Sequence, residues 1–221
     1  MPLILNIETA TRNCSVALSR DGKLLECIEV ADTNYSHAEK LHLFIEEILR
    51  NQGFEHKDLD AVAIGRGPGS YTGLRIGTST AKGLCYALDI PLIAVDTLVV
   101  LAESAEIDEG ILVPMIDARR MEVYSAIFTP DKQTVRPAMA EIITSDYLKE
   151  FEGRIFVCGD CQEKLSPVLS SKRFTFLQDI VFPSAAQMVK LSHAKYKSVD
   201  FEDVAYFEPF YLKDFIAGGG K

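Results

Sequence analysis

The stretch Asp60–Thr97, DAVAIGRGPGSYTGLRIGTSTAKGLCYALDIPLIAVDT, decides the fold of this 221-residue chain. Its apolar run at 61–64 predicts a strand, which a glycine-rich loop at 65–73 follows. A helix is then expected from about residue 72 to residue 88, and a second strand at 92–95. These elements form one βαβ unit, which places a pair of parallel strands in the core.

The glycine loop matches neither of two common phosphate-binding patterns. The dinucleotide pattern G-x-G-x-x-G needs a glycine where Ser70 or Thr72 stands, and the loop has no Gly-Lys-Ser/Thr triplet. Two interpretations stay open: an anion bound by the N–H groups that start the helix, and a loop that only turns under close packing. The glycines that permit positive φ or close backbone approach are Gly65, Gly67, Gly69 and Gly73.

The helix of this unit has a wider apolar surface than one core contact needs. At 100° per residue, small and apolar side chains cover an arc of roughly 200°, about twice the width of a single core face. A second helix, from this chain or from a partner, is therefore expected to pack on it. One side carries Leu74, Gly77, Ala81, Leu84, Cys85 and Leu88, and the second carries Ile76, Thr80, Gly83 and Ala87.

The string GPGSYTGLR at 67–75 resembles the signature of the TsaB (YeaZ) family, subunits of the bacterial machinery that makes threonylcarbamoyladenosine at position 37 of tRNAs. The resemblance extends through ILNIETATRNCSVAL, VPMIDARRMEVYSAIF and EPFYLK, so it covers most of the chain. It implies the fold class of the superfamily of actin, sugar kinases and heat-shock ATPases. That fold is a duplicated, two-lobed, actin-like (ribonuclease H-like) α/β structure with mixed sheets flanked by helices.

The resemblance also implies partners. The glycine-rich helix and the helix before it are expected to pack as a four-helix bundle against the catalytic paralogue TsaD. It also implies that a TsaE-like ATPase is a partner and that the chain forms a homodimer when alone. Contact with tRNA is expected only indirectly, through the complex. Gly77→Leu or Ala81→Glu is expected to abolish association with the paralogue and leave the monomer folded. The expected interface residues are Leu41, Ile45, Ile48, Gly73, Leu74, Gly77, Thr80, Ala81 and Leu84.

Charge and composition restrict the partners and the compartment. The net charge is −9, from 32 acidic and 23 basic residues with no dense basic run. Because phosphate backbones are bound chiefly by Lys and Arg, the chain is a poor main RNA-binding surface, and a basic protein suits it better. No apolar run approaches a membrane span, the start lacks a signal-peptide n-region, and the five cysteines fit a reducing compartment. We expect a cytoplasmic protein without membrane contact.

The first 30 residues predict a hairpin from strands at 3–7 and 15–18, a turn at Asp21-Gly22, and a third strand at 24–30. In ATPases of this superfamily the first hairpin turn holds phosphate and begins with an aspartate. Glu8 stands there, which favours a loop that keeps the fold without full ATPase chemistry. No cofactor is expected, although whether a nucleotide binds stays open, because a glutamate can still serve beside Thr9, Thr11 and Ser15.

A capping box at 36–39 opens the next predicted helix, which Gly53 ends. Its apolar face carries Leu41, Phe44, Ile45, Ile48 and Leu49. His37 and His42 lie about 140° apart around this helix, so no shared metal is predicted.

The paralogue TsaD has two metal-binding histidines after the same glycine loop and helix. Thr97 and Leu101 stand at the matching positions, and neither replaces an imidazole. No metal chemistry is therefore expected, and the older peptidase labels of relatives have no support in these residues.

The acidic stretch at 103–110 predicts a lobe boundary. We expect an N-terminal lobe at 1–103 and a C-terminal lobe at 104–221, with the segment from about 198 packed back on the first lobe. The opening pattern recurs at an offset of 109 residues, which indicates a duplicated unit. This offset pairs Glu8 with Asp117, Val16 with Ser125, Ala17 with Ala126 and Leu18 with Ile127.

Asp117, Arg119 and Arg120 occupy what would be the second phosphate turn of an ATPase. Two arginines there fill the space or bind an anion themselves. A polar cleft or a partner contact is favoured over catalysis.

Three further segments carry motifs. Cys158 and Cys161 precede a helical stretch expected at 162–169, which resembles a redox C-x-x-C, but a structural role is favoured. Ser184 opens a helix to about residue 196. An aromatic segment follows, which either packs in the core or forms a partner surface, and a glycine-rich tail ends the sequence. The aromatic residues are Tyr206, Phe207, Phe210, Tyr211 and Phe215.

Two function classes follow. The first is a non-catalytic subunit that supports a TsaD-like enzyme. The second is an independent ATP-dependent kinase or ATPase of the same fold. Four features favour the subunit: Glu8 in place of aspartate, the arginines of the second turn, the missing histidines and the two-faced helix.

Overall fold

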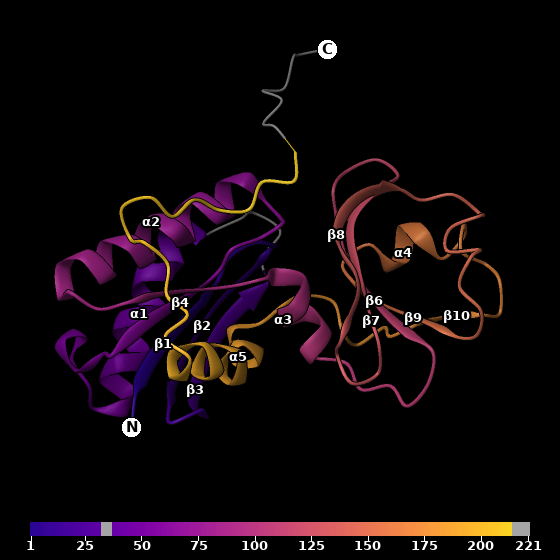
Figure 1. The fold of residues 1–221 in the computed structure, drawn as a ribbon. Coiled ribbons are helices and arrows are strands. Elements are labelled where there is room, and N and C mark those ends of the chain that lie inside the picture. Colours follow the sequence, from indigo (N-terminus) through magenta and orange to yellow (C-terminus); the bar gives the residue numbers. More distant parts are fainter. Residues whose placement is uncertain (32–36, 214–221) are drawn as a thin grey trace, which may run out of the picture.

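The computed structural model describes residues 1–31 and 37–213 and has two lobes, each built on a five-stranded sheet (Figure 1). The first sheet has the order β3-β2-β1-β4-β5, with β1 (Leu3–Glu8), β2 (Asn13–Arg20), β3 (Lys23–Ala31), β4 (Ala61–Gly65) and β5 (Leu92–Val95). The second has the order β10-β9-β6-β7-β8, with β6 (Ile111–Asp117), β7 (Glu122–Phe128), β8 (Thr134–Ile142), β9 (Ile155–Gly159) and β10 (Phe174–Phe176).

Helices cover both faces of the first sheet. Helices α1 (His37–Gln52) and α2 (Tyr71–Leu88) pack on one face, where their apolar side chains meet β1, β2 and β4 in a single core. Helix α5 (Ala185–Lys197) packs on the opposite face, against small residues of β2 and β4. Both faces of β1, β4 and β5 are therefore buried, as their apolar runs require, whereas the edge strand β3 is half-buried or exposed.

The two sheets repeat one topology. In each lobe the first strand is antiparallel to the second and parallel to the fourth, and the strand orders correspond one to one. Short α3 (Thr97–Glu103) joins the lobes and packs on the second sheet. The predicted βαβ unit and duplicated two-lobed fold are confirmed.

The predicted alignment of the two hairpins is wrong by one residue in the second strand. Ile7 pairs with Val16 in the first hairpin, but Ile116 pairs with Tyr124 in the second, because the second turn is one residue shorter. Val16 therefore corresponds to Tyr124, and not to Ser125. The pairs of Ala17 with Ala126 and Leu18 with Ile127 shift likewise, and a shift of one residue exchanges the faces of a strand.

Helix α2 begins one or two residues earlier than predicted. Ser70 is its N-cap, and the Ser70 hydroxyl accepts the Gly73 N–H. The helix ends at Leu88, and Asp89 takes a left-handed conformation with φ of 55°. Helix α4 (Gln162–Leu165) is only one turn, shorter than the stretch expected to residue 169.

The return of the chain to the first lobe begins earlier than the predicted residue 198. The Ala185 N–H donates to the Ser15 hydroxyl at 2.9 Å, and the Asn13 amide donates to the Pro183 carbonyl at 3.1 Å. Helix α5 was expected in the C-terminal lobe, yet it lies wholly on the first sheet. Its apolar face and the small side chains of that sheet explain the placement.

After α5, residues 200–213 form a segment that we call the strap. It pairs with the start of β5 through Glu202 and Leu92, passes beside α2, and inserts Phe207 into the core of the first lobe. The Lys82 ammonium holds it by donating to the carbonyls of Ala205 and Phe207. Core packing is thus confirmed for Phe207, whereas the Tyr206 side chain is 84% exposed.

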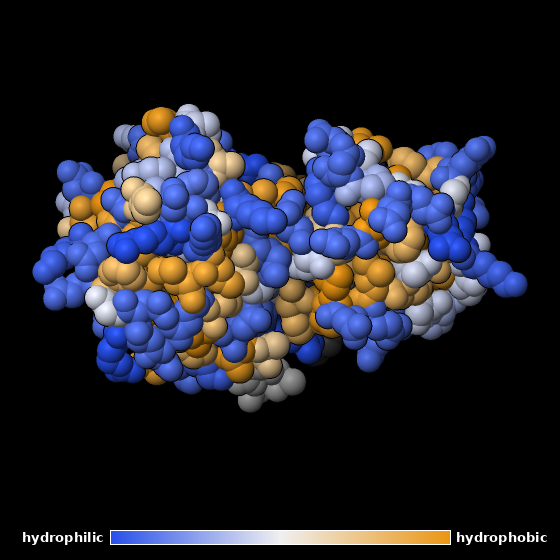
Figure 2. All heavy atoms as spheres, turned by 90° about the horizontal axis from the view of Figure 1, so that it is seen from below, coloured by the Kyte–Doolittle hydropathy of each residue, from blue (hydrophilic) through white to orange (hydrophobic). Residues whose placement is uncertain are grey.

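Some predicted features lie outside the described residues: Ser36 of the first capping box, Phe215 and the tail at 218–221. In the described part of the chain, no helix has the length and apolar character needed to cross a bilayer. Figure 2 shows one face of the two lobes, where apolar side chains form a band across the first lobe among hydrophilic ones.

Candidate functional site

The turn between β1 and β2, where a phosphate would lie in an ATPase of this fold, is packed beneath the glycine loop. A Cβ on Gly65 would lie 2.0 Å from the Glu8 carboxylate, and one on Gly73 would lie 2.1 Å from the Thr9 carbonyl oxygen. Gly69 and Gly77 make similarly close approaches to residues 9 and 10. Among the four loop glycines predicted from the sequence, only Gly67 has a positive φ, so close packing is what the others provide.

The Glu8 side chain is completely buried in this packing. Its carboxylate accepts the Ala10 N–H at 2.7 Å and the Thr97 hydroxyl at 3.2 Å. Burial raises the pKa of this carboxyl from 4.5 to about 7, and hydrogen bonds from Ala10, Thr97 and Thr9 oppose the rise only in part. Glu8 therefore faces the interior and does not take the position of a group that orients metal or water.

The burial of Glu8 makes stability depend on pH. Because the folded chain holds the Glu8 proton more tightly than the unfolded chain, the free energy of unfolding falls as pH rises from 4.5 to about 7. Glu8→Gln resembles the protonated form, so this variant is expected to be more stable than the parent at pH 8 by about 1–2 kcal/mol. Urea unfolding at pH 5 and pH 8 measures the difference, which should be smaller at pH 5. An equal difference at both values would contradict the assignment.

Several of the groups expected to hold an anion are used within the chain. The Ser70 N–H donates to the Ala10 carbonyl at 2.6 Å, and the Gly67 N–H donates to the Thr97 hydroxyl at 3.1 Å. Thr9 is buried and donates to the Gly73 carbonyl at 2.9 Å. Thr11 is buried too, so the anion site expected at Glu8, Thr9 and Thr11 is filled by the protein itself.

The positions that match the metal-binding histidines of the paralogue are internal. Thr97 is fully buried against Glu8, and Leu101 is buried in the core between α3 and the second sheet. Of the predicted helix histidines, buried His37 hydrogen-bonds the Thr11 carbonyl oxygen, whereas His42 is exposed. Within residues 1–31 and 37–213, no group of three His, Cys, Asp or Glu side chains is arranged to hold a metal ion.

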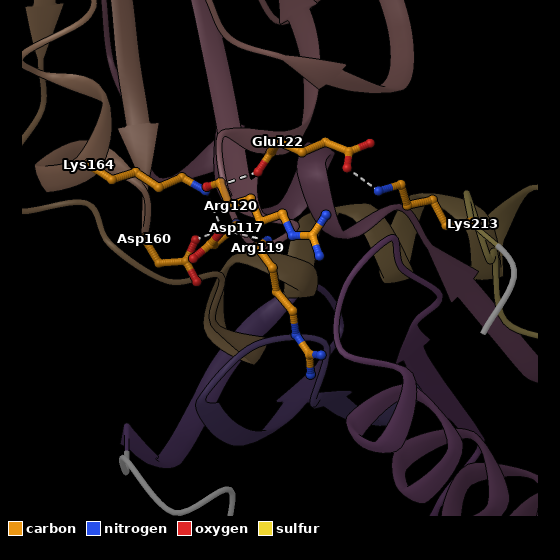
Figure 3. A network of polar contacts seen from close by, with 7 residues as sticks. All are labelled: Asp117, Arg119, Arg120, Glu122, Asp160, Lys164 and Lys213. Carbon is orange, nitrogen blue, oxygen red and sulfur yellow. Dashed lines mark hydrogen bonds and ion pairs between the residues drawn. The ribbon is translucent and has the colours of Figure 1, made fainter. Parts of the chain in front are cut away.

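The second turn is open, unlike the first (Figure 3). Asp117 and both arginines are exposed, and Arg119 extends from the turn toward the first lobe. The Asp117 carboxylate accepts the Arg119 N–H at 2.8 Å and pairs with the Lys164 ammonium. The two predicted turns lie in corresponding places; the first is buried apart from Arg12, whereas the second exposes Asp117 and both arginines.

A hollow of about 660 Å³ lies where the end of β3 faces the segment before α5. Its wall includes Glu29, which accepts hydrogen bonds from Asn13 and Ser15. The Ser184 hydroxyl, the N-cap of α5, lies 3.3 Å from that of Ser15. Because these groups bond one another and the start of α5, they fix α5 on the first sheet.

The side chains predicted for a partner interface belong mostly to the core of the first lobe. Leu41, Ile45 and Ile48 are at most 3% exposed and pack on the sheet. Gly73, Leu74, Gly77, Thr80 and Ala81 are also buried, and Leu84 is partly buried. Helical periodicity correctly predicted which side chains are buried. The side chains expected to contact a partner are, however, already covered by other elements of the first lobe.

The outward surface of α1 and α2 is made by other residues. Leu43 on α1 is 65% exposed and Tyr86 on α2 is 86% exposed, and both are large apolar side chains. Gly83 and Ala87, which lie on the predicted second side of α2, are exposed as well. We call these four residues the outer helix face. In the sequence, they could have been found as small or apolar residues that lie outside the buried stripes of the two helices.

The two cysteines of the C-x-x-C motif are free and buried, in contrast to a redox pair. Burial raises the pKa of Cys158 to about 12 and also raises the pKa of Cys161, so neither thiol ionises near neutral pH. Mild oxidation of the folded protein is therefore expected to form no disulfide between Cys158 and Cys161. Mass spectrometry after non-reducing digestion measures this, with the unfolded chain as the reactive control; a disulfide in the folded sample would contradict it.

The comparisons agree with this arrangement. Residues 31–146 match the family model of TsaD, tRNA N6-adenosine threonylcarbamoyltransferase. The Escherichia coli protein named tRNA threonylcarbamoyladenosine biosynthesis protein TsaB is 30% identical over 97% of this chain and 96% of its own length. YeaZ from Pseudomonas aeruginosa superposes with a TM-score of 0.83 at 25% identity, covering 96% of this chain and all of that one.

A more distant structure supports the fold alone. The ethanolamine utilization protein EutJ from Carboxydothermus hydrogenoformans gives a TM-score of 0.54 at 12% identity, over 86% of this chain and 90% of its own. Together with the repeated sheet topology, these likenesses establish a two-lobed actin-like α/β fold. The chain belongs to the TsaB (YeaZ) family.

Proposed function

We propose that this chain is a non-catalytic subunit in the formation of N6-threonylcarbamoyladenosine at position 37 of tRNAs that read codons starting with A. It binds a TsaD-like catalytic subunit and supports that enzyme, which transfers threonylcarbamoyl from its adenylate to the tRNA. Its relatives from Escherichia coli and Haemophilus influenzae are named as TsaB proteins of this biosynthesis. A cytoplasmic location fits a tRNA substrate.

One observation carries the non-catalytic assignment: the first turn and its carboxylate are buried beneath the glycine loop. A phosphate that entered this turn would have to displace the Ala10 carbonyl from the Ser70 N–H, and Glu8 from Thr97. A buried carboxyl with a raised pKa also repels a nucleotide phosphate once it ionises. These features disfavour the alternative of an independent kinase or ATPase.

The outer helix face supports the docking of the partner there. Leu43 and Tyr86 offer exposed apolar area of the kind that forms interface hot spots. The neighbouring outward residues Glu39, Glu46 and Glu47 give α1 an acidic surface, which complements a basic partner. The same face would serve a homodimer when the chain is alone, and a TsaE-like ATPase would join the assembled pair.

Omitting one component at a time tests this function. The purified chain is mixed with a TsaD-like subunit, a TsaE-like ATPase, tRNA and threonylcarbamoyl-adenylate, and modified adenosine is quantified by mass spectrometry of the digested tRNA. Product should require both this chain and the TsaD-like subunit. Modification of tRNA by this chain alone, or rapid ATP turnover by it, would overturn the non-catalytic assignment.

A further inference from the structure

The turn that joins β6 and β7 carries two adjacent arginines in the left-handed conformation. Arg119 has φ of 71° and Arg120 has φ of 50°, and both residues are exposed. Residues other than glycine adopt this region uncommonly. Neighbouring groups must therefore hold the turn in place.

Three side chains build a frame around the backbone of this turn (Figure 3). The Asp160 carboxylate accepts the Asp117 N–H at 2.8 Å, and Asp117 in turn accepts the Arg119 N–H. The Lys164 ammonium pairs with Asp117 and donates to the Arg120 carbonyl at 2.9 Å. The frame uses the backbone of the two arginines and leaves both guanidinium groups outside it.

The charges at the turn do not cancel. Asp117 forms an ion pair with Lys164, and Glu122 forms one with Lys213. The Asp160 carboxylate interacts electrostatically with the positive charge of Arg12. Among the described residues, neither guanidinium of the turn makes a hydrogen bond or an ion pair. In a chain of net charge −9, two guanidinium groups on adjacent residues that make no ion pair suit an anionic ligand.

Contacts of the strap link the turn to the start of α2. Glu122, two residues beyond Arg120, pairs with Lys213 of the strap. The ring of Tyr211, two residues before Lys213, lies 5.0 Å from that of Tyr71, the first residue of α2. The turn is therefore linked to the N-terminal end of α2, whereas Gly83, Tyr86 and Ala87 of the outer helix face lie near its C-terminal end.

We propose that Arg119 and Arg120 contact phosphate groups of the tRNA held by the assembled complex. This inference rests on the proposed function, in which the assembled complex acts on tRNA. It adds one local cationic contact to a chain whose overall charge disfavours RNA. Guanidinium groups suit phosphate because two N–H groups reach two oxygens.

The test measures the affinity of the assembled complex for tRNA over a series of salt concentrations. Arg119→Gln/Arg120→Gln is expected to weaken binding about tenfold and to lower the slope of log affinity against log salt by about 1 to 2. Lys149→Gln/Arg154→Gln is the matched control, because it removes two exposed charges from the same lobe. Arg119→Lys/Arg120→Lys should keep most of the slope.

The outcomes separate the two proposals. If the parent chain forms the complex but the double Gln variant binds tRNA like the parent, or no more weakly than the control, the tRNA contact is wrong and the subunit function stands. If that variant loses affinity for the protein partner at unchanged tRNA affinity, the arginines contact an acidic protein surface and the inference is overturned. If the parent chain forms no complex, both proposals fail. Thermal unfolding of each variant excludes loss of folding as the cause.

Discussion

Gly73→Ala is expected to destabilise the chain by about 3 kcal/mol or more, at the upper end of the usual cost of overpacking. The new Cβ would lie 2.1 Å from the Thr9 carbonyl oxygen, which is a backbone atom and cannot rotate away. The higher helix propensity of alanine returns only about 1 kcal/mol. The first turn must therefore move away from α2, which also disturbs the hydrogen bond from Thr9 to the Gly73 carbonyl.

Gly83→Ala on the same helix is the matched control. A Cβ at Gly83 meets nothing within 4 Å, so this variant is expected to gain about 0.5–1 kcal/mol from helix propensity alone. Thermal unfolding measures both, and each kcal/mol corresponds to roughly 2–4 °C in a chain of this size. Midpoint temperatures that shift in opposite directions would show that Gly73 is needed for close packing. Equal shifts of the two variants would contradict this.

Tyr86→Glu is expected to weaken binding of the TsaD-like partner about 30-fold or more while the monomer stays folded. The side chain is 86% exposed, so its loss costs the isolated chain little, whereas a tyrosine anchor in an interface contributes about 2 kcal/mol or more. Calorimetric titration of the partner measures the change. Ile142→Glu is the control, because Ile142 is 70% exposed but lies on β8 of the other lobe.

If Tyr86→Glu binds the partner as tightly as the parent chain does, Tyr86 is not part of the interface.

Gly77→Leu and Ala81→Glu, which the sequence suggested for the same purpose, do not test the interface. A Cβ on Gly77 lies 2.2 Å from the Thr9 hydroxyl, and Ala81 is completely buried in the core. Contrary to the expectation from the sequence, both variants are expected to unfold the first lobe.

The sequence predicted the fold well because its signals are local and periodic. The glycine loop, the apolar strand runs and the turn at Asp21-Gly22 each specify their own conformation, and the recurring hairpin indicated the second lobe. The register error at Val16 arose because a turn shorter by one residue leaves almost no trace in a short alignment. Strand pairing depends on contacts between chain segments, which a linear pattern does not record.

The candidate site was predicted only in part, for a similar reason. Glu8 and the glycine loop were identified, but their mutual packing depends on distances between residues 8–10 and 65–77. The predicted interface failed at the level of side chains because a helical wheel shows which residues share a face and not what covers that face. Leu43 and Tyr86, which the structure exposes, lie between the buried positions.

The strap has a consequence for how the protein is made. Phe207 and the turn of chain beside α2 complete the core of the first lobe, yet they are translated after the whole second lobe. On the ribosome, the first lobe therefore keeps an unfilled site in its core until residue 207 has been synthesised, after the whole second lobe. Chains released a few residues before Phe207 would carry an intact second lobe and an open first one, which makes them substrates for cellular quality control.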